Sequence, residues 1–226
     1  MAKKKIQTIF KCSNCGYTQP RWMGRCPECG EWNSFLECAV DKNSRSPAFT
    51  GTDGTVAVKA KPIPLSQVDP MQGTRIFTGI SEFDRVLGGG AMKRSAILIG
   101  GEPGIGKSTL LLQTVAAITK NGVKGHILYV SGEESASQIR ARADRLELSC
   151  DNIEILCTTQ LEDVIEALNT LNPIFTVIDS IQTMFSPEAG NVPSTINQLK
   201  YCAHELIAWV KERDSVLCMS AHITKE

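Results

Sequence analysis

Residues 96–109 read AILIGGEPGIGKST, and their pattern predicts the fold of most of the chain. Its apolar beginning predicts a buried strand, and the run LLLQTVAAI that follows predicts a helix. Between them lies the spacing GxxxxGK[ST], whose glycines let backbone N–H groups point inward at a phosphate, beside the positive end of the helix. This phosphate-binding loop predicts a nucleotide site formed by Gly101, Glu102, Pro103, Gly104, Ile105, Gly106, Lys107, Ser108 and Thr109.

Two side chains of this loop have chemistry of their own. Lys107 can reach the β- and γ-phosphates, and the Ser108 hydroxyl is a ligand suited to Mg²⁺. A second apolar strand, residues 175–178, ends at Asp179, which fits the Walker B role of holding a metal-bound water. A cap at the end of the strand would also explain this carboxylate. We predict that ATP and Mg²⁺ bind here, with Ser108 and Asp179 beside the metal.

Hydrolysis also needs a group that orients or deprotonates the attacking water. The strand at 127–130 leads into Ser131-Gly132-Glu133-Glu134, and we predict Glu133 as the catalytic base, with Glu134 capping the following helix. His222, at the tip of the last predicted strand, is a candidate sensor of the γ-phosphate. A buried structural histidine is the alternative. Together with Lys107 and Asp179, these residues form the predicted catalytic set.

Beyond residue 75, apolar runs alternate with helical patterns, which predicts an α/β fold with a mostly parallel sheet flanked by helices. Such a sheet binds ligands at the C-terminal ends of its strands. One strong helical pattern is the three- and four-residue spacing of apolar residues from Ile196 to Val210. The five predicted strands are residues 96–99, 127–130, 153–156, 175–178 and 216–219.

Two CxxC pairs, Cys12/Cys15 and Cys26/Cys29, lie ten residues apart near the start of the chain. Two such turns facing each other supply four thiolates in the tetrahedral arrangement that suits zinc. A segment this small rarely folds without added stabilisation, so we predict a structural Zn²⁺ held by all four cysteines. Redox-active or ordinary core cysteines are the alternative.

Basic residues and Tyr17, Trp22 and Trp32 share this N-terminal region. Basic and aromatic side chains together can hold single-stranded nucleic acid. Solvated charges around an aromatic mini-core would explain the same composition equally well.

The chain has 226 residues, with 24 Lys and Arg against 24 Asp and Glu, so bulk charge gives no sign of DNA coating. It has no apolar run long enough to span a membrane and no secretory signal, which predicts a cytoplasmic protein. We expect a zinc module at 1–40, a Pro- and Ser-containing linker at 41–70 and an ATPase core at 71–226. Because the sequence stops directly after a predicted strand, we expect that core to be truncated.

Taken together, these motifs resemble those of the bacterial DNA repair protein family RadA, also called Sms. The resemblance rests on CSNCGYTQPRWMGRCPECGEWNSF, TGISEFDRVLGGG, GGEPGIGKSTLLLQ, YVSGEES, VIDSIQT and AHITKE. It implies a RecA-like, DNA-stimulated ATPase of recombinational repair that binds single-stranded DNA and processes branched recombination intermediates by branch migration. It also implies hexameric rings and a recombinase partner.

By the same resemblance, residues 184–195 occupy the position of a DNA-contacting loop, although they include no Lys or Arg. The family's KNRFG motif and Lon-protease-like C-terminal domain are absent from this sequence.

Other classes of P-loop protein fit less well. A P-loop kinase would carry an Arg-rich lid, and a GTPase would carry a guanine-reading NKxD; neither is present. A third hypothesis is a zinc-ribbon nucleic-acid-binding adaptor on an inactive P-loop fold. The intact Lys107, Ser108, Glu133 and Asp179 disfavour it.

Overall fold

The computed structural model describes residues 6–14, 17–27, 30–41, 62–67 and 75–223. The chain divides into two compact units, Met1–Gln72 and Gly73–Glu226. Most of the expected linker lies outside the described residues. Apart from Asp41, which ends a strand of the first unit, its described part is residues 62–67, which contain the 3₁₀ helix η1 (Leu65–Gln67).

The first unit contains a three-stranded antiparallel sheet. Its central strand β1 (Ile6–Cys12) pairs with β2 (Thr18–Gln19) on one side and with β3 (Phe35–Asp41) on the other. The register places Cys12 opposite Phe35. Both residues are buried in a small cluster with Cys26, against which Phe10 packs.

The second unit is built on a five-stranded parallel sheet with the strand order β6-β10-β9-β7-β8. The five predicted strands are all present and all parallel, so the α/β fold expected from the sequence is confirmed. The strands are β6 (Ser95–Gly101), β7 (Ile127–Ser131), β8 (Ile153–Cys157), β9 (Phe175–Asp179) and β10 (Val216–His222). A short antiparallel pair of strands, β4 (Arg75–Ile76) and β5 (Ala91–Met92), precedes this sheet in the sequence.

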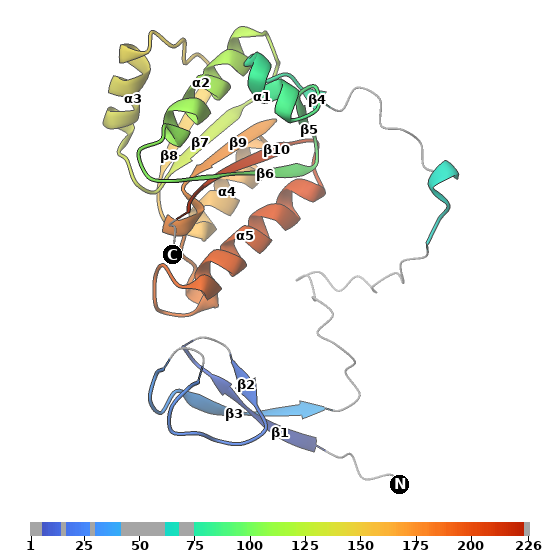
Figure 1. Ribbon diagram of the computed structural model, residues 1–226, viewed down its shortest axis with the longest axis vertical. Helices are drawn as coiled ribbons and strands as arrows, with labels where there is room; N and C mark the ends of the chain where they lie inside the picture. Colours follow the sequence, from blue (N-terminus) through green and yellow to red (C-terminus); the bar gives the residue numbers. More distant parts are fainter. Residues whose placement is uncertain (1–5, 15–16, 28–29, 42–61, 68–74, 224–226) are drawn as a thin grey trace. The chain divides into compact units, whose positions relative to one another are not determined.

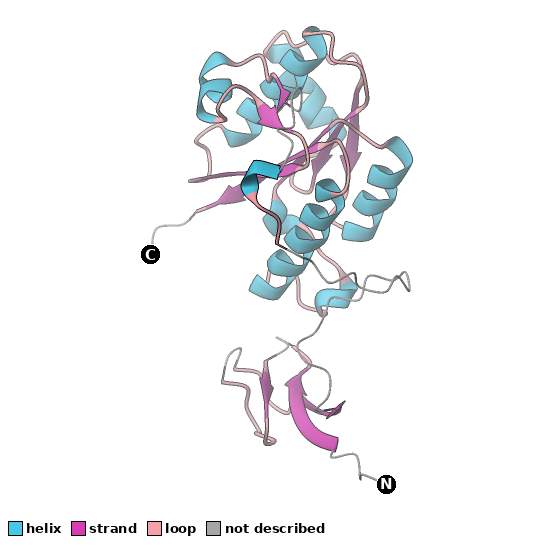
Figure 2. Ribbon diagram, turned by 90° about the vertical axis from the view of Figure 1, so that its right-hand side faces the viewer, coloured by secondary structure: helices cyan, strands magenta, loops and turns pink. Residues whose placement is uncertain are grey.

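Helices cover both faces of the sheet, as Figures 1 and 2 show. One face is covered by α1 (Ser81–Val86), α2 (Lys107–Lys120) and α3 (Ala136–Arg145). The other is covered by α4 (Leu161–Leu171) and α5 (Ile196–Lys211). Two 3₁₀ turns, η2 (Ile181–Thr183) and η3 (Pro187–Ala189), connect β9 to α5.

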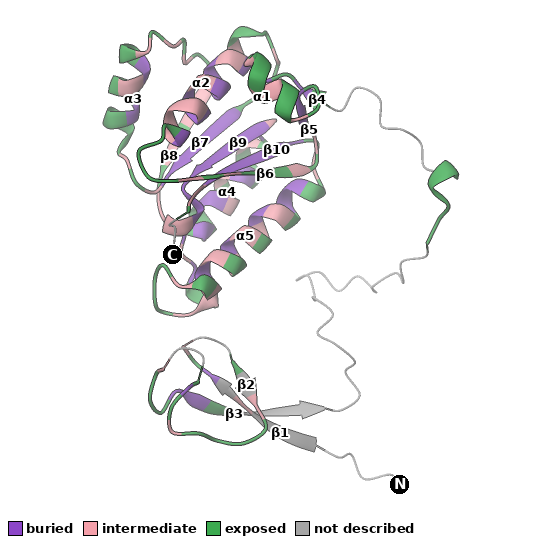
Figure 3. Ribbon diagram, viewed as in Figure 1, coloured by how far each residue is buried: buried purple, intermediate pink, exposed green. Residues whose placement is uncertain are grey.

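The alternation of side chains along the strands produces two hydrophobic cores, one on each face. In β7, Ile127 and Tyr129 contribute to the core beneath α2 and α3, whereas Leu128 and Val130 contribute to the core beneath α4 and α5. All four are buried, which explains why this strand is a continuous apolar run in the sequence. Figure 3 shows the buried central strands between helices whose outer faces are exposed.

The connections between the strands determine where a ligand site can form. From β6 the chain passes to β7 and then to the edge strand β8, and it returns to insert β9 and β10 between β7 and β6. The strand order therefore reverses within the sheet, and parallel α/β sheets bind ligands at the C-terminal ends of the strands near such a reversal. The predicted catalytic residues lie at or just after the ends of β6, β7, β9 and β10.

Candidate active site

The phosphate-binding loop forms a continuous turn between β6 and α2. Gly104 and Gly106 have φ values of 78° and 102°, in the left-handed region where glycine is favoured. Gly106 is the N-cap of α2, so Lys107 is the first helical residue and Ser108 lies in the first turn. Residues 102–106 are exposed, whereas Lys107 is buried. The loop thus presents its backbone to solvent above an inward-directed lysine.

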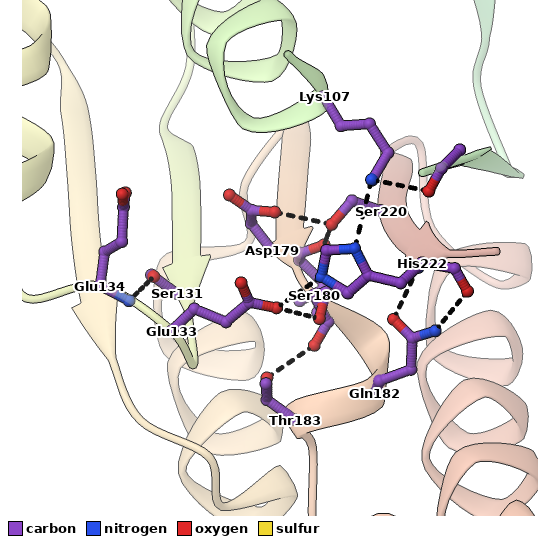
Figure 4. A network of polar contacts seen from close by, with 12 residues as sticks. Lys107, Ser131, Glu133, Glu134, Asp179, Ser180, Gln182, Thr183, Ser220 and His222 are labelled. Atoms are coloured by element: carbon purple, nitrogen blue, oxygen red, sulfur yellow. Dashed lines mark hydrogen bonds and ion pairs between the residues drawn. The ribbon is translucent and has the colours of Figure 1, made fainter. Parts of the chain in front are cut away.

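The Lys107 ammonium has partners in the phosphate-binding loop and at the end of β10. Its Nζ atom donates to the carbonyl oxygens of Gly101 and Glu102, both at 2.9 Å, and lies 3.3 Å from His222 Nδ1. An ammonium can only donate, so Nδ1 of the imidazole accepts and Nε2 carries the hydrogen. That Nε2 lies 3.1 Å from Glu133 Oε1 and donates to it. His222 therefore links Lys107 to Glu133 (Figure 4).

Glu133 and Glu134 have different partners although they are adjacent in the sequence. Glu133 accepts a hydrogen bond of 2.6 Å from the Ser180 hydroxyl and is directed toward His222. The Glu134 carboxylate instead forms an ion pair with Arg142 of α3. The N-cap of α3 is Ser135, so the prediction that Glu134 caps this helix is wrong. Of the two carboxylates, only Glu133 contacts His222.

Asp179 is buried at the end of β9, and both of its carboxylate oxygens accept hydrogen bonds. Ser220 Oγ donates to Oδ1 at 2.6 Å, and Tyr129 Oη donates to Oδ2 at 2.8 Å. Burial and the nearby Asp179 charge raise the pKa of Tyr129 far above its usual range, so its hydroxyl remains a donor. Within the described part of the chain, no basic side chain forms an ion pair with Asp179. A buried carboxylate with neutral partners fits a role as a metal ligand.

Gln182, in η2, is a site residue that the sequence analysis missed. Its Nε2 donates to the His222 carbonyl and its Oε1 accepts from the His222 N–H, both at 2.8 Å. The pairing of β10 with β9 ends at Met219 opposite Ile178. The Gln182 amide therefore takes the place of a strand neighbour at the point where β9 has ended. An amide side chain has no chemistry that stands out in a sequence, and only its position three residues after Asp179 could have drawn attention to it.

The two cysteine turns of the first unit have equivalent backbone geometry. The N–H of Cys12 donates to the carbonyl of Tyr17 at 2.8 Å, and the N–H of Cys26 donates to the carbonyl of Glu31 at 2.9 Å. Each bond joins residues five apart. The antiparallel residue pairs that close the two turns are Lys11 with Thr18 and Arg25 with Trp32. Their positions relative to Cys12 and Cys26 are the same in the two turns.

This geometry brings the first cysteine of each CxxC pair into one core. Cys12 and Cys26 are both buried in the same cluster. The second members of the pairs, Cys15 and Cys29, lie outside the described residues. Two equivalent turns that converge on buried thiols fit the predicted zinc site.

Comparisons with known proteins agree with this architecture. Residues 10–37 match the family described as rubredoxin metal binding domain, and residues 76–156 match the ATPase family described as KaiC. The DNA repair protein RadA of Treponema pallidum (strain Nichols) is 58% identical over 99% of this chain and 47% of its own length. The proteins of the same name from Rickettsia bellii (strain RML369-C) and Bacillus subtilis (strain 168) are 45% and 41% identical over 100% of this chain and 48% of theirs.

The chain belongs to the RadA family. It spans about half the length of the curated relatives it matches. The zinc-ribbon and RecA-like ATPase folds expected from the sequence are therefore confirmed for this RadA-family chain. Among its described residues, no helix is both long enough and apolar enough to cross a membrane.

Proposed function

We propose that this chain is the zinc-bearing ATPase part of a DNA repair protein that hydrolyses ATP in response to DNA. The observation that supports the proposal best is the contact of His222 with both Lys107 and Glu133, beside the buried Asp179. A phosphate-binding cation, a carboxylate suited to a metal and a carboxylate suited to a base are the groups that ATP hydrolysis needs. Together with His222, these groups lie at or just after the ends of four neighbouring strands, β6, β10, β9 and β7.

In the proposed reaction, a water molecule attacks the γ-phosphorus of ATP and Glu133 accepts one of its protons. The bond from the γ-phosphorus to the β,γ-bridging oxygen breaks, which releases ADP and phosphate. Lys107 donates to the β- and γ-phosphate oxygens and stabilises the charge that develops there. The loop residues 101–109 surround the phosphates with backbone N–H groups.

Two metals belong to the proposal. Mg²⁺ neutralises phosphate charge when bound, and the Ser108 hydroxyl and Asp179 are its proposed ligands. Tyr129 and Ser220 hold the Asp179 carboxylate in a fixed orientation while leaving it without an ion-pair partner among the described residues. Zn²⁺ is proposed to be structural.

His222 is proposed to sense the γ-phosphate. Its imidazole accepts from Lys107 and donates to Glu133, so a phosphate that draws the ammonium away removes one of its two partners. The imidazole is then free to turn its hydrogen-bonding atoms toward the phosphate or the attacking water. His222 thereby couples occupancy of the loop to the orientation of Glu133.

The proposed biological setting rests on the name of the relatives, DNA repair protein RadA. For the whole protein we propose binding to single-stranded and branched DNA, branch migration, hexameric rings, a recombinase partner and a place in the cytoplasm. For this chain we propose a zinc module at 1–40, a linker at 41–70 and the ATPase core from 71. The presence of the complete catalytic set in this chain disfavours an inactive adaptor.

The test is phosphate release from Mg-ATP by the full chain, measured with and without single-stranded DNA. Lys107→Ala should lower the rate by about 10²- to 10³-fold, the usual effect of removing a preorganised transition-state donor. The matched control is Lys120→Ala, which removes an exposed lysine at the other end of the same helix and should leave the rate unchanged. A wild-type chain that binds Mg-ATP but releases no phosphate would support the adaptor instead.

A further inference from the structure

Two tryptophans of the first unit are exposed, although they lie in a domain with a very small core. The side chains of Trp22 and Trp32 are 54% and 67% exposed. The core cluster of this unit contains Cys12, Cys26 and Phe35 and does not include either tryptophan. The interpretation of these residues as an aromatic mini-core is therefore wrong. Large aromatic surfaces left in water indicate a binding function.

The two rings lie next to the same glycine. A Cβ atom added to Gly24 would lie 3.8 Å from Cη2 of Trp22 and 3.9 Å from Cζ3 of Trp32. Both rings therefore lie beside the backbone of Gly24, which has no side chain. The N–H of Asn33 donates to the Gly24 carbonyl at 2.8 Å, which fixes Gly24 against the backbone segment that contains Trp32.

An arginine is held against the more exposed ring. The Arg25 guanidinium lies 5.7 Å from the centroid of the Trp32 ring, within range of a cation–π interaction. Its Nε donates to the Gly30 carbonyl at 2.9 Å, so the guanidinium is fixed by the cysteine turn. Arg25 and Trp32 also face each other as an antiparallel bridge. The ring and the cation are thus positioned before any ligand arrives.

The charge of the surrounding sequence selects among possible partners. Residues 1–40 contain six Lys and Arg but three Asp and Glu, so they stay positive even with the formal charge of −2 that a Zn²⁺ and four thiolates contribute. Exposed aromatic faces beside positive charge are the two features that bind single-stranded nucleic acid, since every base has a face that can stack and every linkage has a phosphate. A protein partner would use the aromatic surface but has no general need for the excess of positive charge.

We propose that Trp22 and Trp32 form a stacking surface for the bases of single-stranded DNA, with Arg25 positioned for the phosphate backbone. The proposal rests on the DNA-dependent function proposed above and assigns part of the DNA contact to the first unit rather than to the ATPase core. Stacking does not depend on base identity, so the surface binds single strands with little sequence preference.

The experiment uses the zinc-loaded full chain and a fluorescently labelled oligothymidylate, with affinity measured by anisotropy at fixed salt. Trp32→Ala should weaken binding by about 5- to 150-fold, the loss that corresponds to one stacked base. Trp32→Phe keeps an aromatic face and should retain most of the affinity. The matched control is Leu36→Ala, since Leu36 is an exposed apolar residue of the same unit and should have no effect.

Tryptophan emission provides a second readout that a change in stability would not reproduce. The chain has three tryptophans, and the third, Trp209, is buried in the ATPase core. Oligothymidylate should quench the wild-type emission but not that of Trp22→Phe/Trp32→Phe, in which Trp209 is the only tryptophan left.

The outcomes separate this inference from the proposed function. If Trp32→Ala binds DNA as tightly as wild type while DNA still stimulates phosphate release, the stacking surface is refuted and the ATPase proposal stands. The surface then fits a protein partner. If wild type releases phosphate without any response to DNA but the tryptophans are quenched, the stacking surface stands and the DNA-dependent ATPase is refuted. Equal losses in Trp32→Ala and Leu36→Ala also refute the surface.

Discussion

Gln182 holds the end of β10 in the position that places His222 between Lys107 and Glu133. Replacing it by alanine removes two hydrogen bonds of 2.8 Å, one to the N–H and one to the carbonyl of His222. Nothing in the described structure connects the Gln182 side chain to the phosphate-binding loop itself. The substitution should therefore disturb the catalytic arrangement while leaving nucleotide binding largely intact.

The size of the effect follows from the number and exposure of these bonds. Each neutral hydrogen bond contributes about 0.5–1.5 kcal/mol net, so the two together contribute about 1–3 kcal/mol. His222 is only partly buried, so water can replace part of what Gln182 supplied. The lower half of that range is therefore expected, and at about 1.4 kcal/mol for each factor of ten it corresponds to a fall in kcat of about 5- to 30-fold.

The assay is steady-state phosphate release over a range of ATP concentrations. For Gln182→Ala we expect the fall in kcat with KM changed less than about twofold. Gln182→Glu retains the acceptor for the His222 N–H but loses the donor, and it should also be impaired. Gln67→Ala, which removes an exposed glutamine outside the ATPase core, serves as the control. A wild-type kcat in Gln182→Ala, or a change confined to KM, would refute the reasoning.

Further substitutions test other parts of the structure. Tyr129→Phe removes the 2.8 Å hydrogen bond to Asp179 and should lower the free energy of unfolding in urea by about 1.5–3 kcal/mol, with a smaller loss in an Asp179→Asn background. Because the pKa of Tyr129 is raised, this contribution should be complete at pH 7–9 and decline only above the ordinary tyrosine value near 10. Leu206→Ala shortens a fully buried side chain of α5 and should lower the free energy of unfolding in urea by about 2–5 kcal/mol. Burial raises the pKa of Cys218 to about 12, so a thiol reagent should react slowly with this residue at pH 8. Cys157 lies at the exposed end of β8, so Cys157→Ser should remove a fast phase of the reaction with the reagent, and Cys218→Ser should not.

The sequence was sufficient for the strands and the loop because their physical requirements restrict the residue types. A strand buried on both faces is mostly apolar, so residues 127–130 stand out as an apolar run, and residues 175–178 do so with Thr176 as their one polar residue. The loop needs glycine at positions of left-handed backbone, and Gly104 and Gly106 have that conformation. These features are local, and a single sequence is enough to identify them.

The side-chain network of the site depends on strand order, which no local pattern encodes. Lys107 and His222 are 115 residues apart and meet because β10 is inserted beside β6. Glu133 and Glu134 are indistinguishable by type, and the partner that separates them, Arg142, lies on a different element. Gln182 is identified only by the hydrogen bonds of its amide to the backbone of His222 in the last strand.

The zinc module also combines a feature that the sequence predicted with one that required the structure. The spacing of its cysteines predicted two equivalent turns, and the described halves of those turns have matching hydrogen bonds. The same composition left the tryptophans open to two interpretations. Only the exposure of Trp22 and Trp32 in the structure decides against a mini-core.

The role of Glu133 as the base is tested by comparing ATP binding with ATP cleavage in Glu133→Gln. Binding of Mg-ATP is measured at equilibrium, and release of the γ-phosphate is measured in a single turnover. The proposed mechanism predicts wild-type binding with cleavage slowed by about 10²- to 10⁴-fold, because the amide cannot accept the proton of the attacking water. Cleavage by Glu133→Gln at the wild-type rate would contradict it, as would a wild-type chain that does not bind Mg-ATP.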